Sequence, residues 1–579
     1  MELEGHLVFV DLRMNPRAFR LGACFRLRHG SGFHRCDIWP VSVHANSGAS
    51  SGSFYKWSPL HLHELLDSLS HGLLCFCVFC VVCFFTMELQ KRNGVSLPKI
   101  LATWLLLLAA SAGPAECIRE NPSFSEQDEG GGGGGAAEEF RYSAASCRTH
   151  TASLADFGGV GDGVTSNTAA FGDAVAHLSQ FASDGGGMLF VPAGRWLTGP
   201  FNLTSSFTLF LHRDAVILAT QNVNEWPVID PLPSYGRGRD HPGGRYSSLI
   251  GGSNLTDVII TGDNGTIDGQ GATWWSKFHG NKLKYTRGYL IELMHSDQIF
   301  ITNLTLLNSP AWNIHPVYSS NIVISGITIL APVHSPNTDG INPDSCSNVR
   351  IEDCYIVSGD DCVAIKSGWD EYGIAYGMPS QHILVRRLVC VSPTSAVIAL
   401  GSEMSGGIRD VRAEDITAVN SESGVRIKTA IGRGAYVRDV FVRRMTLDTM
   451  KWVFWMTGNY KSHPDDKYDP NAIPVVDGIS YSDVTAVNVT MAARLEGIPG
   501  APFTGVCISN VTVALRKARK LPWYCTDVEG VSSGVTPVTC ASLADQGTDN
   551  GGSGLCPFPT DPAPMEDVQL QECAYVKTS

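Results

Sequence analysis

The sequence has no excess of positive charge and no hydrophobic run that spans a membrane comfortably. Its formal net charge is −13 over 579 residues, which argues against nucleic acid as the main partner. The apolar segment Ile100–Ala110 is shorter than the length that a membrane span needs. A local basic patch can still bind an anionic substrate, because such a patch can oppose the sign of the whole chain.

The cysteines also lack the spacing of a metal site. The four from Cys75 to Cys83 lie in the apolar run Leu73–Phe85, without a histidine or a second cysteine pair of suitable spacing for zinc. We therefore expect no metal and no cofactor. Eleven cysteines follow from Cys117 onward, an odd number that leaves at least one thiol unpaired. The density near the C-terminus is typical of disulfide-bonded secreted proteins, and involves Cys507, Cys525, Cys540, Cys556 and Cys573.

A second methionine, Met87, opens a segment with the features of a signal peptide. Basic residues precede the run Ile100–Ala110, and small residues follow it as far as Ala115. We expect residues 1–86 to be an extension introduced by the gene model, residues 87–115 to be a signal peptide, and the protein to be extracellular, in the cell wall. The alternative is a type II anchor, with membrane association only if the apolar segments are retained. Glycosylation sequons agree with secretion, at Asn202, Asn254, Asn264, Asn303, Asn488 and Asn510.

Short β-branched runs recur along the chain, each with one polar residue followed by alternating apolar positions. Equivalent apolar positions are separated by 23, 27, 34, 28 and 29 residues, at Ile299, Ile322, Val349, Ile383, Val411 and Val440. Without helical periodicity between the runs, this pattern predicts an all-β, single-stranded right-handed parallel β-helix. A propeller would need longer four-stranded repeats, and a sandwich would need regular hairpin signals.

The predicted β-helix occupies residues 146–525 and begins with a capping helix around Thr168–Ala182. The run Gly130–Gly135 lies in residues 116–145, which we expect to be a flexible linker. Residues 526–579 form a cysteine-containing C-terminal tail. We expect the protein to be a monomer.

Three aspartates, Asp339, Asp360 and Asp361, are spaced so that they fall on adjacent coils, which lie about 4.8 Å apart. Asp360 and Asp361 are consecutive, so both reach one groove only if the chain bends, which Gly359 permits. Carboxylates this close titrate in separate steps, and one retains its proton near neutral pH. A protonated acid beside an ionised base is what glycosidic cleavage requires.

A basic pair, Arg426 and Lys428, follows about two coils later. The two residues lie at i and i+2 of a predicted strand, so both point outward while Ile427 packs inward. Arginine offers a carboxylate two parallel hydrogen bonds. The pattern therefore favours an acidic substrate.

These clusters resemble the signature motifs of glycoside hydrolase family 28, the polygalacturonases, over roughly residues 150–525. The matching segments are Asn337-Thr338-Asp339-Gly340-Ile341, Ser358-Gly359-Asp360-Asp361-Cys362, Arg426-Ile427-Lys428, Asn308-Ser309-Pro310-Ala311-Trp312, Asp268-Gly269-Gln270-Gly271 and Gly478-Ile479-Ser480-Tyr481. The resemblance implies a pectin-lyase-like β-helix and inverting hydrolysis of the α-1,4-galacturonan of pectin (homogalacturonan).

By the same resemblance, Asp360 is the general acid, and Asp339 and Asp361 activate the attacking water. Arg426 and Lys428 would bind the substrate carboxylate, and Tyr481 would contact the sugar. One departure is Ala396, which occupies the position of the histidine in the family's Gly-His-Gly motif. Glu403 and His382 are the candidate replacements for that histidine, although no sequence feature positions either residue.

Two other functions remain open. Ala396 suggests a wall protein that binds galacturonan with weakened catalysis. A pectate lyase on a similar β-helix is the second alternative, although a lyase would need clustered calcium ligands with an arginine base. Products from polygalacturonate distinguish the three functions.

Overall fold

The computed structural model describes residues 138–518, 521–547, 555–566, 568 and 570–577, together with four short strands near the N-terminus. These strands pair antiparallel, β1 (Ala18–Leu21) with β4 (Val41–His44) and β2 (Arg28–His29) with β3 (Gly32–Phe33). They belong to a unit, residues 1–131, separate from residues 132–579. The predicted signal peptide and alternative anchor lie outside the described residues. No helix in the described part is long and apolar enough to cross a membrane.

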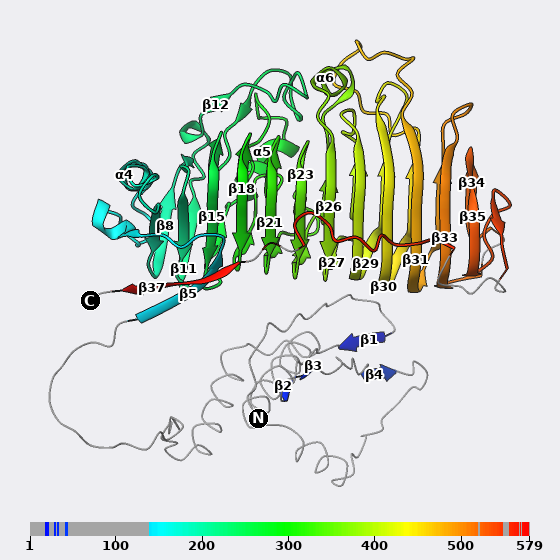
Figure 1. Ribbon diagram of the computed structural model, residues 1–579, viewed down its shortest axis with the longest axis horizontal. Coiled ribbons are helices and arrows are strands. Elements are labelled where there is room, and N and C mark those ends of the chain that lie inside the picture. The colour runs from blue at the N-terminus through cyan, green and yellow to red at the C-terminus, as the bar shows by residue number, and fades with distance from the viewer. Residues whose placement is uncertain are drawn as a thin grey trace, which may run out of the picture. The chain divides into compact units, whose positions relative to one another are not determined.

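Residues 146 onward form a parallel β-helix, as the repeated pattern predicts. Each coil contributes strands to up to three parallel ladders, and Figure 1 shows the coils side by side along the length of the unit. We call these ladders the strap sheet, the middle sheet and the groove sheet. From Ile408 onward, long strands turn from one sheet into the next: β29 (Ile408–Lys428), β30 (Tyr436–Thr457), β31 (Val475–Val489) and β33 (Phe503–Leu515).

The strap sheet contains the first part of each coil: β6 (His150–Ser153), β7 (Gly187–Val191), β10 (Phe207–Leu211), β15 (Thr256–Gly262), β18 (Asp297–Thr302), β21 (Ser320–Ser325), β23 (Ser347–Glu352), β26 (Ser380–Arg386), β35 (Val528–Thr536) and β36 (Leu543–Asp545). The middle sheet contains β8 (Gly194–Thr198), β11 (Ala215–Ala219), β16 (Thr266–Asp268), β19 (Thr305–Leu307), β22 (Thr328–Leu330), β24 (Tyr355–Val357) and β27 (Val389–Val391). The groove sheet contains β9 (Phe201–Asn202), β14 (Ile250–Ser253), β17 (Ile291–Met294), β20 (Ile314–Val317), β25 (Val363–Ile365), β28 (Ala396–Gly401), β32 (Met491–Glu496) and β34 (Trp523–Thr526). A separate antiparallel pair is formed by β12 (Val228–Ile229) and β13 (Arg245–Tyr246).

The strand register confirms the predicted period. Ile299 pairs with Ile322, and the ladder continues through Val349, Ile383, Val411 and Val440. All six side chains are buried in the principal hydrophobic core, which runs through the stacked coils.

The polar residue of each repeat also has a structural role. It adopts a left-handed conformation, with φ between 48° and 58° in Gln298, Asn321, Asn348, His382, Asp410 and Asp439. Asn and Asp tolerate this conformation better than β-branched residues do. The repeat therefore encodes a bend followed by a strand.

A helix lies where one was expected, at the N-terminal end of the coils (Figure 1). The helix α4 (Thr168–Ser179) packs one apolar face, including Phe171, Ala174 and Leu178, into the principal core. Two 3-10 helices, η1 (Leu154–Phe157) and η2 (Val223–Glu225), and two further helices, α5 (Ala272–His279) and α6 (Asp370–Tyr376), lie in connecting segments.

The predicted boundaries at both ends of the β-helix need correction. The predicted linker ends in a strand, β5 (Glu138–Ala144), that pairs antiparallel with β37 (Gln571–Lys577). Beyond residue 525, β35 and β36 continue the strap sheet. The predicted tail therefore contains part of the β-helix, because alternating apolar residues such as Val528 and Leu543 remain buried after that boundary.

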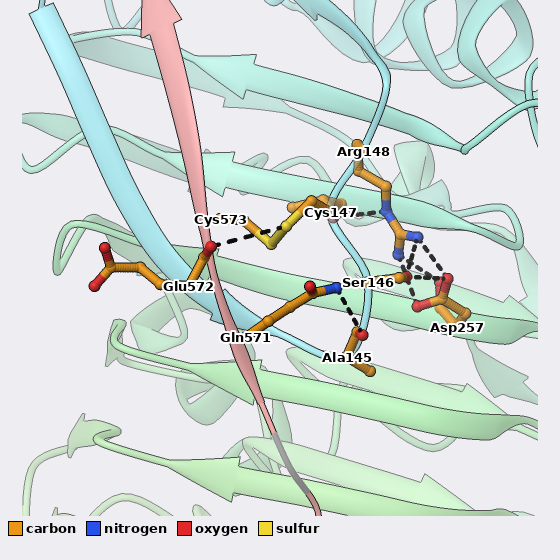
Figure 2. Close-up of a disulfide and its surroundings, with 9 residues drawn as sticks. Ala145, Ser146, Cys147, Arg148, Asp257, Gln571, Glu572 and Cys573 are labelled. Atoms are coloured by element: carbon orange, nitrogen blue, oxygen red, sulfur yellow. Dashed lines mark hydrogen bonds and ion pairs between the residues drawn. A yellow bond between two sulfur atoms is a disulfide. The ribbon is translucent and has the colours of Figure 1, made fainter.

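The last described residues, 555–566, 568 and 570–577, form what we call the C-terminal strap. Arg350 donates a hydrogen bond to the Met565 carbonyl at 2.8 Å, and Arg412 pairs with Asp561 at 3.0 Å. The disulfide Cys147–Cys573 then joins the strap to the start of the β-helix (Figure 2). The strap thus connects late and early parts of the chain across the strap sheet.

Candidate active site

The three predicted carboxylates meet beside the groove sheet. Asp360 and Asp361 lie in the turn between β24 and β25, and Asp339 lies on the preceding coil. The Gly340 N–H donates to the Asp361 carbonyl at 2.9 Å, which fixes the two coils against each other. One carboxylate oxygen from each aspartate lies within 4.8 Å of the other two.

The turn that carries Asp360 and Asp361 depends on a glycine and a disulfide. A Cβ atom on Gly359 would lie 2.1 Å from the Ser335 carbonyl oxygen, so a side chain does not fit there. Cys362 forms a disulfide with Cys390 on the next coil. Asp360 and Asp361 line the same pocket, which confirms the predicted bend. The glycine is needed for close backbone approach.

Asp361 is held as an anion. Its Oδ1 accepts hydrogen bonds from the Ser395 hydroxyl at 2.5 Å and the Ala396 N–H at 3.0 Å, and its Oδ2 lies 2.6 Å from the Lys428 ammonium. Burial acts to raise the pKa of Asp361, but the positive charges of Lys428 and Arg426 outweigh burial and hold the pKa below its usual value. The coil that carries Ala396 therefore contributes a hydroxyl and a backbone N–H.

Asp339 and Asp360 have the opposite electrostatics. Burial and the charge of Asp361 raise the pKa of Asp360. Burial and the charge of Asp360 raise the pKa of Asp339 to about 8. The Asn342 amide donates to Asp339 Oδ2 at 3.0 Å, while Asp339 Oδ1 is buried with no partner among the described residues. At mildly acidic pH this pair retains a proton while Asp361 stays ionised, which is an acid beside a base.

The basic pair lies near the end of β29, where Ile427 points into the core as predicted. The two cations then diverge. Lys428 lines the pocket and contacts Asp361, whereas Arg426 lies 3.6 Å above the centre of the Trp455 ring and 3.4 Å from the Glu422 carboxylate. Lys428 is thus part of the carboxylate cluster, and Arg426 flanks it.

The structure corrects the expected substrate contact of Tyr481. Its side chain has no exposed surface and stacks on Phe454 with ring centres 4.2 Å apart. Tyr481 follows Val442 in an inward-facing ladder of the strap sheet. The preceding Gly478 has φ of 68° at the bend position of its coil, so this motif is structural. The tyrosines that line the pocket are Tyr289 and Tyr460.

Sequence reasoning missed several residues of the pocket and left others undecided. The residues that line it together with the aspartates include Arg239, Arg287, Trp312, Lys366, Glu403 and Tyr460. A charged residue directly after the buried strand β25 was a usable signal for Lys366. Arg239 gave no signal, because it lies in the irregular segment between β12 and β13. Glu403 does reach the pocket, whereas His382 pairs with Asp410 at 2.7 Å on the strap sheet.

A groove that combines a protonated carboxyl group with an ionised one, on a parallel β-helix, defines a hydrolase of glycosidic bonds. The family model for glycosyl hydrolases family 28 matches residues 234–540. The chain is also 71% identical to a "Probable polygalacturonase" of Vitis vinifera, over 76% of this chain and 89% of that protein. The chain belongs to glycosyl hydrolases family 28.

Two solved structures share the fold of this chain. An exopolygalacturonase from Thermotoga maritima has 29% sequence identity and a TM-score of 0.57, covering 65% of this chain and 90% of that one. A family 28 exopolygalacturonase from Yersinia enterocolitica shares the fold at 19% identity, with a TM-score of 0.58 and coverage of 68% and 79%.

Proposed function

We propose that this protein hydrolyses the α-1,4-galacturonosyl linkages of polygalacturonate, the acidic backbone of pectin. The observation that carries the proposal is the unequal protonation of the carboxylate cluster, with Asp361 ionised beside the protonated pair of Asp339 and Asp360. The nearby cations Lys428 and Arg426 suit a substrate that carries a carboxylate on each sugar.

In the proposed reaction, Asp360 donates its proton to the glycosidic oxygen as the bond to the anomeric carbon breaks. Water attacks that carbon and transfers a proton to a carboxylate of Asp339 or Asp361, so one proton is given and one is recovered. The ionised form of Asp361 is stabilised more than that of Asp339, because Ser395, Ala396 and Lys428 all donate hydrogen bonds to Asp361.

The stereochemical outcome needs its own measurement. One oxygen of each carboxylate lies within 4.8 Å of an oxygen of each of the other two, whereas the carboxyl groups of inverting glycosidases are typically about 6.5–9.5 Å apart. The spacing therefore does not favour the predicted inversion over retention. Proton NMR of the first-formed product measures the outcome: a β-anomer means inversion of the α-linkage, and an α-anomer means retention.

Incubation of the purified protein with polygalacturonate tests the activity. New reducing ends without unsaturated sugars are expected. Ultraviolet-absorbing unsaturated ends would instead identify a lyase, and retention on the polymer without cleavage would identify a binding protein.

We also propose that the protein is secreted to the extracellular space. Four disulfides support an oxidising compartment, namely Cys147–Cys573, Cys362–Cys390, Cys507–Cys556 and Cys525–Cys540. All six sequon asparagines are exposed on the β-helix. N-terminal sequencing of protein from the culture medium is expected to give a first residue near Glu116, and a product retained in membranes would contradict secretion.

A further inference from the structure

Lys366 is a buried cation that the acid–base scheme above does not use. It directly follows β25, and its backbone forms a parallel β-bridge with that of Asp344 on the preceding coil of the groove sheet. Its ammonium nitrogen lies 3.2 Å from the Glu403 carboxylate and 3.8 Å from Asp339 Oδ2, and 4.5 Å from the centre of the Trp312 ring. Lys366 thus lies between Asp339, which belongs to the carboxylate cluster, and Glu403, which does not.

Glu403 balances this lysine from the opposite side. Its Oε1 lies 2.8 Å from the Arg239 guanidinium, and its side chain is 1% exposed. Arg239 in turn lies 4.7 Å from the centre of the Trp369 ring, which fixes its position. Positive and negative charges therefore alternate along a series of contacts that ends at the catalytic pair: Arg239, Glu403, Lys366 and Asp339.

We propose that Lys366 is a positioning residue that favours transfer of the proton of the catalytic pair from Asp339 to Asp360 by stabilising the anion of Asp339, and that Glu403 limits how strongly Lys366 does so. Lys366 lies beside Asp339, whereas Asp360 has no ion pair with it. A cation at this distance favours the ionised form of the nearer carboxyl group. The productive state, with Asp360 protonated and Asp339 ionised, is then reached at a lower free-energy cost than without the lysine, while burial and the charge of Asp360 keep the pKa of Asp339 raised. This inference rests on the proposed hydrolysis.

Several other charges act on the same groups. The charges of Asp360, Asp361 and Lys428 act on the pKa of Asp339, as that of Lys366 does. The charges of Asp361 and Lys428 act on the pKa of Lys366, as that of Glu403 does. Glu403 is also influenced by Lys428 and Arg433. Asp240 lines the pocket but is paired with Arg287 at 2.9 Å. Among these groups, only Lys366 contacts both Asp339 and Glu403, so variants at Lys366 and Glu403 change the field at Asp339 in opposite senses.

The test compares the pH profiles of kcat for Lys366→Met and Glu403→Gln. Removing the lysine raises the pKa values of the pair, so the profile is expected to move to higher pH by about one unit. At mildly acidic pH, kcat is expected to fall about tenfold with KM nearly unchanged. Removing the Glu403 charge is expected to move the profile to lower pH. Lys366→Arg restores the cation and is expected to resemble the unmodified protein.

The matched control is Arg387→Met, which removes a cation paired with Asp353 at 2.7 Å, on a different face of the coil, and should leave the profile in place. Shifts of the same sign in both pocket variants, or none, would overturn the role of Lys366. Potentiometric difference titration of the same folded variants between pH 4 and 9 measures the shifts without substrate. Absence of hydrolysis by the unmodified protein would sink the proposed function alone, while this titration still decides the inference.

Discussion

The pocket and one turn of the β-helix carry similar side chains with different consequences. Where the strap sheet turns into the middle sheet, acidic and basic residues form what we call the charge ladder: Glu352, Asp353, Arg386, Arg387, Glu414, Asp415, Arg443 and Arg444. Ion pairs within it measure 2.6–2.9 Å. In the ladder each carboxylate meets at least one guanidinium, whereas in the pocket three aspartates are clustered around two lysines.

The difference appears in protonation. Arg387 and Arg444 help to hold the pKa values of Asp353 and Asp415 below their usual value, so these residues stay charged. In the pocket, burial and like charge raise the pKa values of Asp339 and Asp360. The same β-helix thus provides stable ion pairs where cations match anions, and a titrating acid where buried carboxylates outnumber cations.

The largest expected effect separates the two regions directly. Asp360→Asn removes the proton donor and is expected to lower kcat by about 10²–10⁴-fold, with the fold and substrate binding retained. Asp353→Asn, a matched change in the charge ladder, should leave kcat unchanged. Reducing-end release and circular dichroism of both variants measure this contrast. Near-normal turnover in Asp360→Asn would remove that residue from the acid role.

The two cations of β29 should differ in the next largest effect. Arg426→Ala is expected mainly to weaken substrate binding, because Arg426 flanks the cluster without contacting an aspartate. Lys428→Ala should also lower kcat, because it removes the ion pair that keeps Asp361 ionised. Measured KM and kcat values separate these outcomes. Equal losses of kcat in both variants would show that the charge of Arg426 matters to Asp361 as much as the direct ion pair with Lys428 does.

The sequence predicted the coil period and the meeting of the three aspartates, because both follow from local patterns. Ile299 and its equivalents stack in register, and a fixed period brings the residues at equal offsets together. The substrate contact predicted for Tyr481 was wrong, because its motif belongs to the same coil repeat and places the side chain at an inward-facing position. The positions of Arg239 and the C-terminal strap could not be predicted, because their partners lie far along the chain and no repeat encodes those contacts.

A smaller effect is expected from the strap, which acts on stability rather than chemistry. Cys147→Ser breaks the disulfide to Cys573 and is expected to cost about 2–5 kcal/mol of unfolding free energy, with kcat at 25 °C unchanged. Thermal unfolding measures the loss of Tm. The double variant Cys147→Ser/Cys573→Ser should lose no more than the single variant. A fall in kcat of the folded single variant would instead connect the strap to the pocket.

The last prediction compares how the two regions respond to pH. The pKa of Asp339 is raised to about 8 in the folded protein from an ordinary value of 3.8, so the folded state binds this proton more tightly than the unfolded state does. The unfolding free energy should therefore fall as pH rises from about 4 to about 8. Asp339→Asn removes this titration and should flatten the slope.

The pKa of Asp353 is lowered, so its contribution is present above its unfolded pKa and is lost as pH falls through the folded value. Asp353→Asn should therefore change stability without altering the slope between pH 4 and 8. Denaturant unfolding across this range measures both slopes, and an unaltered slope in Asp339→Asn would place the raised titration on another group.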